Sequence, residues 1–176
     1  MSPVPPDLAS RVRDAALLEG DFVLSSGKRS SFYVDKYLFS TEPDLLRDLA
    51  NAISERLPEG VDRLAGVELG AVPLVVATAL ATGLPYVIVR KAAKEHGSSA
   101  GRDVEGDLER GERVALIEDV VTTGTQAVRA AENLERTGVD VVTIVAVLDR
   151  REAPEPDLGG FPFQALLRIE DLRVGR

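Results

Sequence analysis

One stretch of the sequence joins two adjacent acids to a hydroxyl-rich turn. The apolar residues 114–117 predict a strand that leads into this stretch, and residues 126–137 predict a helix after it. The stretch itself is Glu118, Asp119, Val120, Val121, Thr122, Thr123, Gly124, Thr125 and Gln126. Amides of such a turn and of a helix N-terminus bind phosphate, and carboxylates accept hydrogen bonds from a vicinal diol or from water on Mg²⁺. The stretch therefore predicts a ribose 5-phosphate site. An ordinary strand-to-helix turn capped by threonines is the alternative.

A second group of residues is basic, in a chain whose formal net charge is −8. Its members are Arg90, Lys91, Lys94 and His96. A local group of cations on an acidic chain favours a small polyanionic ligand, and a solvated basic loop is the alternative. The acidic total argues against a protein that binds a nucleic-acid backbone. Residues 95–113, rich in glycine and charge, predict a mobile loop next to the cations, with hinges at Gly97, Gly101 and Gly106.

The composition limits the remaining chemistry. With 176 residues, of which 44% are hydrophobic, the chain fits a single domain, 1–176, with a sizeable core. It has no cysteine and one histidine, which excludes a disulfide scaffold, thiolate chemistry and a structural zinc site. Any metal must therefore be held by oxygens. No apolar run is long enough to span a membrane, and the N-terminus is unlike a secretory signal, so we expect a cytoplasmic protein.

The first part of the chain predicts a helix, a small β-unit and a second helix. Apolar residues at helical spacing from Leu8 to Leu18 predict a helix that ends at Gly20. Residues 22–24 and 32–34 predict two short strands around a turn. The capping-box spacing at 41–44 opens a helix that Pro58 and Gly60 end, with the apolar stripe Leu45, Leu49, Ile53 and Leu57.

Strands and helices alternate from Leu64 onward. The predicted strands are 64–67, 86–89, 114–117 and 139–148, and the predicted helices are 72–80 and 127–134, the second ended by Gly138. Strands that are apolar on both faces favour a parallel sheet covered by helices on both sides. The expected fold is therefore α/β, with the acids at the carboxyl edge of the sheet, where such folds bind ligands.

The stretch from Glu118 to Gln126 resembles the phosphoribosyl pyrophosphate signature of the type I phosphoribosyltransferases. Three further segments resemble the orotate phosphoribosyltransferases in particular, and they occur in the family's order. They are Phe22 to Lys36, Arg90 to Gly97 with the pattern R-K-x-x-K-x-H-G, and Leu148 to Glu152 with the pattern D-R-x-E. The resemblance implies a central, mainly parallel sheet flanked by helices, a small N-terminal hood within 1–40 and a flexible catalytic loop at 95–113. It also implies transfer of ribose 5-phosphate from phosphoribosyl pyrophosphate to orotate, with release of diphosphate, in pyrimidine (UMP) biosynthesis.

The resemblance also implies a role for individual residues. Arg90, Lys94 and His96 contact the pyrophosphate, with Lys94 and His96 catalytic, and Lys91 reaches the active site of the neighbouring subunit in a homodimer. His96 acts either as a general acid or as one more hydrogen-bond donor. Orotate is held by Thr122 and Arg150, and Mg²⁺ is bound through the sugar donor and water rather than by direct protein ligands. An ion pair of Arg150 with Asp149 or Glu152 is the alternative for that arginine.

The chain departs from the family pattern in two places. Some members carry a lysine where this chain has Ser25, and its contact is lost or replaced from Lys28 or Arg29. Residues 66–73 match the family's pyrophosphate loop in glycine and proline placement but lack the lysine of some relatives, so amides of Gly70 and Ala71 would be the main donors there. Two rival functions share the signature. One is a phosphoribosyltransferase for another base, such as a purine, and the other is a regulator that senses the sugar donor without turnover.

Overall fold

The computed structural model describes residues 7–23, 27, 29–91, 103–152 and 155–173. Within them, a seven-stranded sheet has the order β5-β4-β3-β6-β7-β9-β8. Its strands are β3 Arg63–Val67, β4 Tyr86–Val89, β5 Val104–Glu105, β6 Arg113–Val121, β7 Asp140–Asp149, β8 Asp157–Leu158 and β9 Phe161–Arg168. Neighbours among β4, β3, β6, β7 and β9 are parallel, and the short edge strands β5 and β8 pair antiparallel. The predicted α/β fold with a mainly parallel sheet is confirmed.

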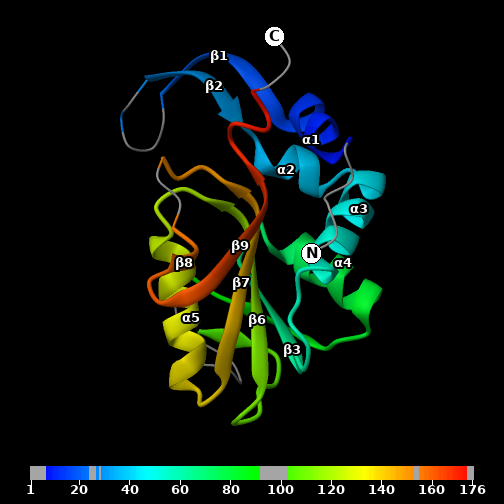
Figure 1. Ribbon diagram of the computed structural model, residues 1–176, viewed down its shortest axis with the longest axis vertical. Helices are drawn as coiled ribbons and strands as arrows, with labels where there is room; N and C mark the ends of the chain where they lie inside the picture. Colours follow the sequence, from blue (N-terminus) through cyan, green and yellow to red (C-terminus); the bar gives the residue numbers. More distant parts are fainter. Residues whose placement is uncertain (1–6, 24–26, 28, 92–102, 153–154, 174–176) are drawn as a thin grey trace.

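Helices cover both faces of this sheet (Figure 1). Helices α3 (Pro43–Ser54) and α4 (Val72–Thr82) lie on one face, and α5 (Thr125–Arg136) lies on the other. The central strands bury side chains on both faces. Ile117 and Val145 join the core under α3 and α4, while Leu116 and Ile144 join the core under α5. No helix within the described residues is long and apolar enough to cross a membrane.

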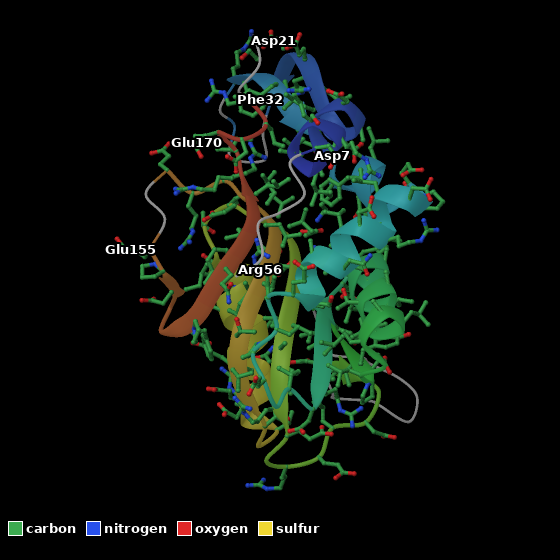
Figure 2. All side chains as sticks on the ribbon, turned by 45° about the vertical axis from the view of Figure 1, so that its right-hand side comes forward. Asp7, Asp21, Phe32, Arg56, Glu155 and Glu170 are labelled. Carbon is green, nitrogen blue, oxygen red and sulfur yellow. The ribbon has the colours of Figure 1, made fainter. Side chains whose placement is uncertain are left out.

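A small N-terminal unit, here called the hood, stands beyond the carboxyl ends of the parallel strands (Figure 1). It comprises α1 (Leu8–Ala16), the antiparallel hairpin of β1 (Leu17–Val23) and β2 (Arg29–Val34), and α2 (Lys36–Ser40). The segment after β9 turns back to the same end, where Figure 2 shows Glu170 near Phe32. There the guanidinium of Arg173 lies 5.3 Å from the centre of the Phe32 ring. The first and last described segments thus meet above the sheet edge.

Three predicted helix boundaries are wrong. The first helix ends at Ala16 rather than at Gly20, because Leu17 and Leu18 pair with Val34 and Tyr33 in the hairpin. Cross-strand pairing overrides the helical spacing of Leu18. Helix α3, the second helix predicted from the sequence, is capped by Glu42 rather than by Thr41.

The caps of the third helix explain its real boundaries. The carboxylate of Glu42 accepts a hydrogen bond from the amide of Leu45 at 2.7 Å, while the hydroxyl of Thr41 donates back to the carbonyl of Tyr37 at 2.6 Å. The helix ends at Ser54, so Leu57 lies beyond it but still packs against the core. Its apolar stripe was therefore predicted one turn too long.

The predicted loop 95–113 is divided by the structure. Residues 92–102 lie outside the described residues. The part from 103 onward contains β5, which pairs with β4, and β6 begins at Arg113. The strands β8 and β9 near the end of the chain were not predicted. Pro162 and Gln164 interrupt the apolar pattern of β9, and its place at the sheet comes from parallel pairing with β7.

Candidate active site

The acid pair lies at the carboxyl end of β6, in the middle of the sheet. Glu118 and Asp119 are only 6% and 4% exposed. Burial, followed by the neighbouring charge of Asp119, raises the pKa of Glu118 from its ordinary 4.5 to about 8. Asp119 instead forms an ion pair, because the ammonium of Lys36 lies 2.7 Å from its Oδ2 atom. The two acids therefore have different surroundings: burial favours the protonated form of Glu118, while Asp119 contacts a cation.

The turn after β6 forms a cradle at the start of α5. A cavity of about 40 Å³ is lined there by Glu118, Val120, Val121, Thr122, Thr123, Gly124, Gln126 and Ala127. The N-cap residue of this helix is Gly124, which has no side chain to cap it, and the amide of Thr125 makes a long hydrogen bond of 3.4 Å to the hydroxyl of Thr123. Gly124 has a φ of 81°, and a β-carbon there would also collide with the side chain of Leu158. The predicted phosphate-binding turn is thus assembled around a position that requires glycine.

Arg150 follows β7 directly, beside this turn. Its amide donates a hydrogen bond to the carbonyl of Val121 at 2.8 Å. The half-buried guanidinium lies 5.9 Å from the centre of the Phe32 ring in the hood, and burial lowers its pKa. The predicted alternative, an ion pair with Asp149, is not formed, because Asp149 pairs with Arg151 at 3.1 Å. Arg150 is therefore positioned between the signature turn and the hood.

Arg90 and Lys91 come from β4, two strands away from the acid pair. They share a cavity of about 380 Å³ with Gln126 and Arg129 of α5, so these cations and the signature line the same hollow. Arg90 lies 3.5 Å from the carboxylate of Glu105, and the amide of Lys91 donates to the carboxylate of Glu68 at 2.7 Å. Lys94 and His96 lie outside the described residues.

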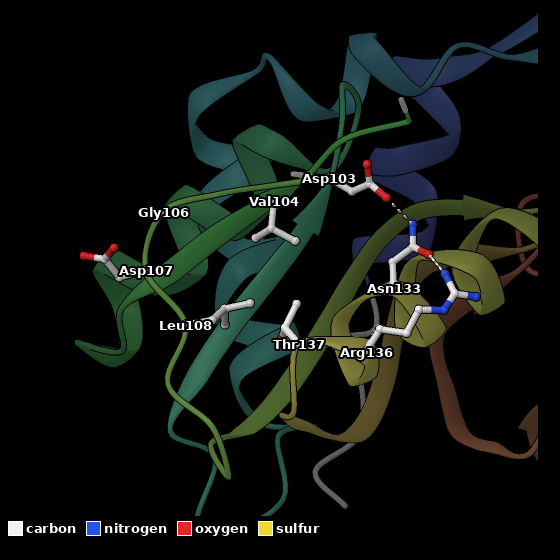
Figure 3. A pocket seen from close by; sticks show the side chains of 8 residues that line it. All are labelled: Asp103, Val104, Gly106, Asp107, Leu108, Asn133, Arg136 and Thr137. Carbon is white, nitrogen blue, oxygen red and sulfur yellow. Dashed lines mark hydrogen bonds between the residues drawn. The ribbon is translucent and has the colours of Figure 1, made fainter. Parts of the chain in front are cut away.

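Described residues on either side of positions 92–102 are hydrogen-bonded to each other beside this hollow. The amide of Arg90 donates to the carbonyl of Asp103 at 2.7 Å. Figure 3 shows the carboxylate of Asp103 accepting a hydrogen bond from Asn133 of α5, at 3.1 Å, while Arg136 donates to the same asparagine. These contacts border a separate pocket of about 440 Å³ that contains none of the predicted site residues. Asp103, the first described residue after position 102, is thus held against α5.

The predicted pyrophosphate loop passes directly over the acid pair. A β-carbon at Gly70 would collide with the carboxylate of Asp119. The amide of Ala71, one of the two predicted donors, already donates to the carbonyl of Val67 at 3.2 Å. Sequence reasoning assigned no role to Lys36, whose contact with Asp119 arises only when the hood folds over the sheet. A lysine at the start of a short helix carries no sequence signal for such a contact.

Comparisons with known proteins agree with this geometry. Residues 41–163 match the family described as "Phosphoribosyl transferase domain". The orotate phosphoribosyltransferase of Natronomonas pharaonis is 44% identical over 97% of this chain and 98% of that protein. Two solved structures of the orotate phosphoribosyltransferase of Mycobacterium tuberculosis also match. The complex with Fe(III) dicitrate has a TM-score of 0.82 and 31% identity over 97% of this chain and 99% of that one. The complex with 5-phospho-α-D-ribosyl 1-diphosphate has a TM-score of 0.79 and 26% identity over 98% of this chain and all (100%) of that one.

These matches extend over nearly the full chain, beyond the segment that carries the signature. They include the hood, which a shared signature alone would not require. They also favour orotate over the rival bases considered from the sequence, because the relatives that match at this identity carry the orotate name. The chain belongs to the type I phosphoribosyltransferases and, among them, to the orotate phosphoribosyltransferases.

Proposed function

We propose that the carboxyl ends of β6 and β7 form the site at which this enzyme transfers the phosphoribosyl group of 5-phospho-α-D-ribose 1-diphosphate to orotate. One observation carries the proposal. The cradle at the start of α5 and the guanidinium of Arg150 belong to adjacent strands, with Val121 paired to Asp149 in register. A phosphorylated sugar on the first strand then lies next to a carboxylate-bearing base on the second.

The sugar phosphate occupies the cradle in this proposal. The cradle is a small cavity of about 40 Å³ lined by the signature turn, which suits a compact group such as a phosphate monoester. The uncapped N-terminus of α5 and the hydroxyls of Thr123 and Thr125, which lie 3.1 Å apart, supply its donors. Glu118 and Asp119 then face the ribose hydroxyls, whose hydrogen bonds their carboxyl oxygens can accept.

Orotate lies between Arg150 and Thr122. Its carboxylate is a planar anion, and a guanidinium offers a matching pair of donors. Arg150 is half-buried against Phe32, so an anion bound there would be partly shielded from water and would gain more from the charge. The hood contributes the apolar wall of this pocket through Phe32.

The reaction develops charge on both sides of the anomeric carbon. The bond from that carbon to the diphosphate oxygen breaks, its electron pair leaves with the diphosphate, and a ring nitrogen of orotate bonds to the carbon while its proton passes to the diphosphate or to water. Positive charge builds on the sugar and negative charge on the leaving group, as in other glycosyl transfers. Arg90, Lys91, Lys94 and His96 supply positive charge on the leaving-group side. No covalent intermediate on the protein is required.

Mg²⁺ belongs to the proposal as a partner of the sugar donor. Among the described residues no group of three or more acidic or histidine side chains could hold a metal ion. Asp119 is already paired with Lys36, so the acid pair fits contacts with metal-bound water or with ribose hydroxyls better than direct ligation. When bound to the donor, Mg²⁺ would neutralise negative charge on the diphosphate.

A homodimer with shared active sites completes the proposal. Lys91 is exposed at the end of β4 and lines the hollow on the leaving-group side, where a neighbouring subunit could use it. Mixing Lys91→Ala with Arg150→Gln protein after unfolding and refolding tests this. Random pairing of two variants, each inactive alone, should restore about a quarter of the original activity in mixed dimers with one intact site. Recovery of no activity would remove the sharing of sites.

The substrate assignment has a direct test. The purified protein is incubated with the sugar donor, Mg²⁺ and one base at a time, and the absorbance of orotate is followed. Loss of signal with orotate, with no product from adenine, guanine, hypoxanthine or uracil, supports the proposal. Turnover of a purine at a comparable rate would contradict it.

A further inference from the structure

Lys36 links the hood to the acid pair. It is the first residue of α2, a short helix capped by Asp35, whose carboxylate accepts a hydrogen bond from the amide of Tyr37 at 3.0 Å. Its ammonium reaches Asp119, 2.7 Å away. Burial alone would lower the pKa of Lys36, but the hydrogen bond and the charge of Asp119 outweigh it, so the pKa is raised. Lys36 is therefore a fixed cation at the centre of the site.

The same ammonium lies against the predicted pyrophosphate loop. A β-carbon placed on Gly70 would be 3.0 Å from the Nζ atom of Lys36 and would collide with the carboxylate of Asp119. Any side chain at position 70 is therefore in conflict with the ion pair. Loop 66–73 has no lysine of its own, yet a lysine ammonium lies beside its backbone at this position. The charge reaches the loop from the hood instead.

Lys36 also has capacity for a second anion. An ammonium has three hydrogen-bond donors. The described contacts give one carboxylate partner, Asp119, whose side chain is 5% exposed, whereas 32% of the Lys36 side chain stays exposed. An anion arriving over the loop can therefore bind the ammonium while Asp119 keeps its partner. Without such an anion, the charge of Lys36 is balanced by Asp119 alone.

We propose that Lys36 is a diphosphate-binding residue of this enzyme and supplies, from the hood, the cation that loop 66–73 lacks. The inference rests on the proposed function, because it presumes that the sugar donor binds over the acid pair. It adds Lys36 of α2, which lies outside the signature turn, to the residues that contact the leaving diphosphate. It also assigns the hood a role in binding the donor as well as the base.

A purely structural role for Lys36 makes a different prediction. If Lys36 only held Asp119 in place, its loss would weaken ligands that contact Asp119 through ribose hydroxyls. If it binds diphosphate, its loss would weaken ligands that contain diphosphate. Magnesium diphosphate and ribose 5-phosphate separate the two roles, because each carries one half of the sugar donor.

The test is calorimetric titration of the full chain with each probe. Lys36→Met should weaken magnesium diphosphate by about 10-fold or more, the loss of one charge-assisted contact, and leave ribose 5-phosphate within about twofold. Lys36→Arg, which keeps the charge, should stay within about threefold for both. The matched control is Arg47→Met, which removes an exposed cation paired with Asp44 on α3 and should change neither. Unchanged diphosphate affinity in Lys36→Met, or a parallel loss of both probes, overturns the proposal.

A measurement on the unaltered enzyme covers the case in which Lys36→Met does not fold. Acetylation of Lys36 by a small amine reagent is followed by mass spectrometry. Saturating magnesium diphosphate should slow it by about 10-fold relative to ribose 5-phosphate, since the ammonium would be engaged on its exposed side. Equal protection by the two probes would refute the role. Orotate turnover in the same preparation is scored separately, so a failure of the proposed function is distinguishable from a failure of Lys36.

Discussion

Arg151 and Asp149 form a nearly buried ion pair, with 3.1 Å between the guanidinium and the carboxylate. Arg151 also donates to the carbonyl of Glu155 at 3.0 Å and lies 4.6 Å from the centre of the Phe163 ring. Asp149, the acid that precedes Arg150 at the end of β7, is thereby paired with Arg151 rather than with Arg150. Adjacent arginines at the end of β7 thus have different surroundings: Arg151 is paired with a buried acid, while Arg150 lies between the signature turn and the hood.

Substitution of Arg150 should affect catalysis, whereas substitution of Arg151 should affect stability. Arg150→Gln should lower kcat/KM for orotate by about 100-fold, since a charged, bidentate contact to a partly shielded carboxylate is lost. KM for the sugar donor should stay within about threefold. Arg151→Gln should instead lower the free energy of unfolding by about 3 kcal/mol, because the buried carboxylate of Asp149 would lose the cation with which it is paired and keep the hydrogen bond from the amide of residue 151. Steady-state kinetics and urea unfolding of both variants check this, and equal kinetic losses in the two would contradict the division.

Gly124 should tolerate no side chain. Gly124→Ala forces a residue with a β-carbon into a φ of 81° and against Leu158, so we expect a loss of about 2–4 kcal/mol in stability and weaker donor binding. Leu158→Ala in the same chain removes the collision but not the backbone strain. The double variant should therefore recover only part of the loss. Full recovery would show that the positive φ costs nothing at this turn.

The acid pair predicts a pH dependence of stability. Because the pKa of Glu118 is about 8 in the folded protein and 4.5 ordinarily, the folded state binds a proton that the unfolded state has lost between these values. Stability should fall as pH rises through this window, by at most about 1.4 kcal/mol per pH unit. Glu118→Gln removes the titrating group, so its stability relative to the original chain should increase from pH 5 to pH 8. If the free energies of unfolding of the two proteins, measured in urea, differ by the same amount at every pH from 5 to 8, the raised pKa of Glu118 is contradicted.

Lys94 provides the test of the leaving-group cations. Lys94→Ala should reduce turnover by about 100-fold, the usual loss for one transition-state charge contact, without changing the unfolding midpoint. Turnover close to that of the original chain would remove Lys94 from the mechanism. His96→Asn distinguishes its two roles, because the pH–rate profile loses a limb only if His96 is a general acid.

The sequence predicted the parts of this fold that depend on local pattern. The buried strands of the central sheet and the turn at Gly124 were found because apolar runs and glycine placement are local signals. The hairpin pairing that ends α1 at Ala16 depends on a partner strand, and so does the position of β9. The Lys36–Asp119 contact joins residues far apart in the chain, and no spacing rule connects them. What was missed is therefore long-range pairing rather than residue chemistry.

The pairing of β6 with β7 places the proposed sites for the sugar donor and for the base on two different strands. Val121 is paired with Asp149, so the turn proposed to bind the sugar and the arginine proposed to bind the base leave the sheet side by side from adjacent strands. Adjacent strands lie about 4.8 Å apart, close to the span between a sugar and the ring attached to it. In the proposed site, exchange of a few positions at the end of β7 and around Phe32 would alter the choice of nucleobase, while the donor contacts at the start of α5 and at Lys36 stay unchanged. A change of base specificity would then require no change in the buried core of the sheet.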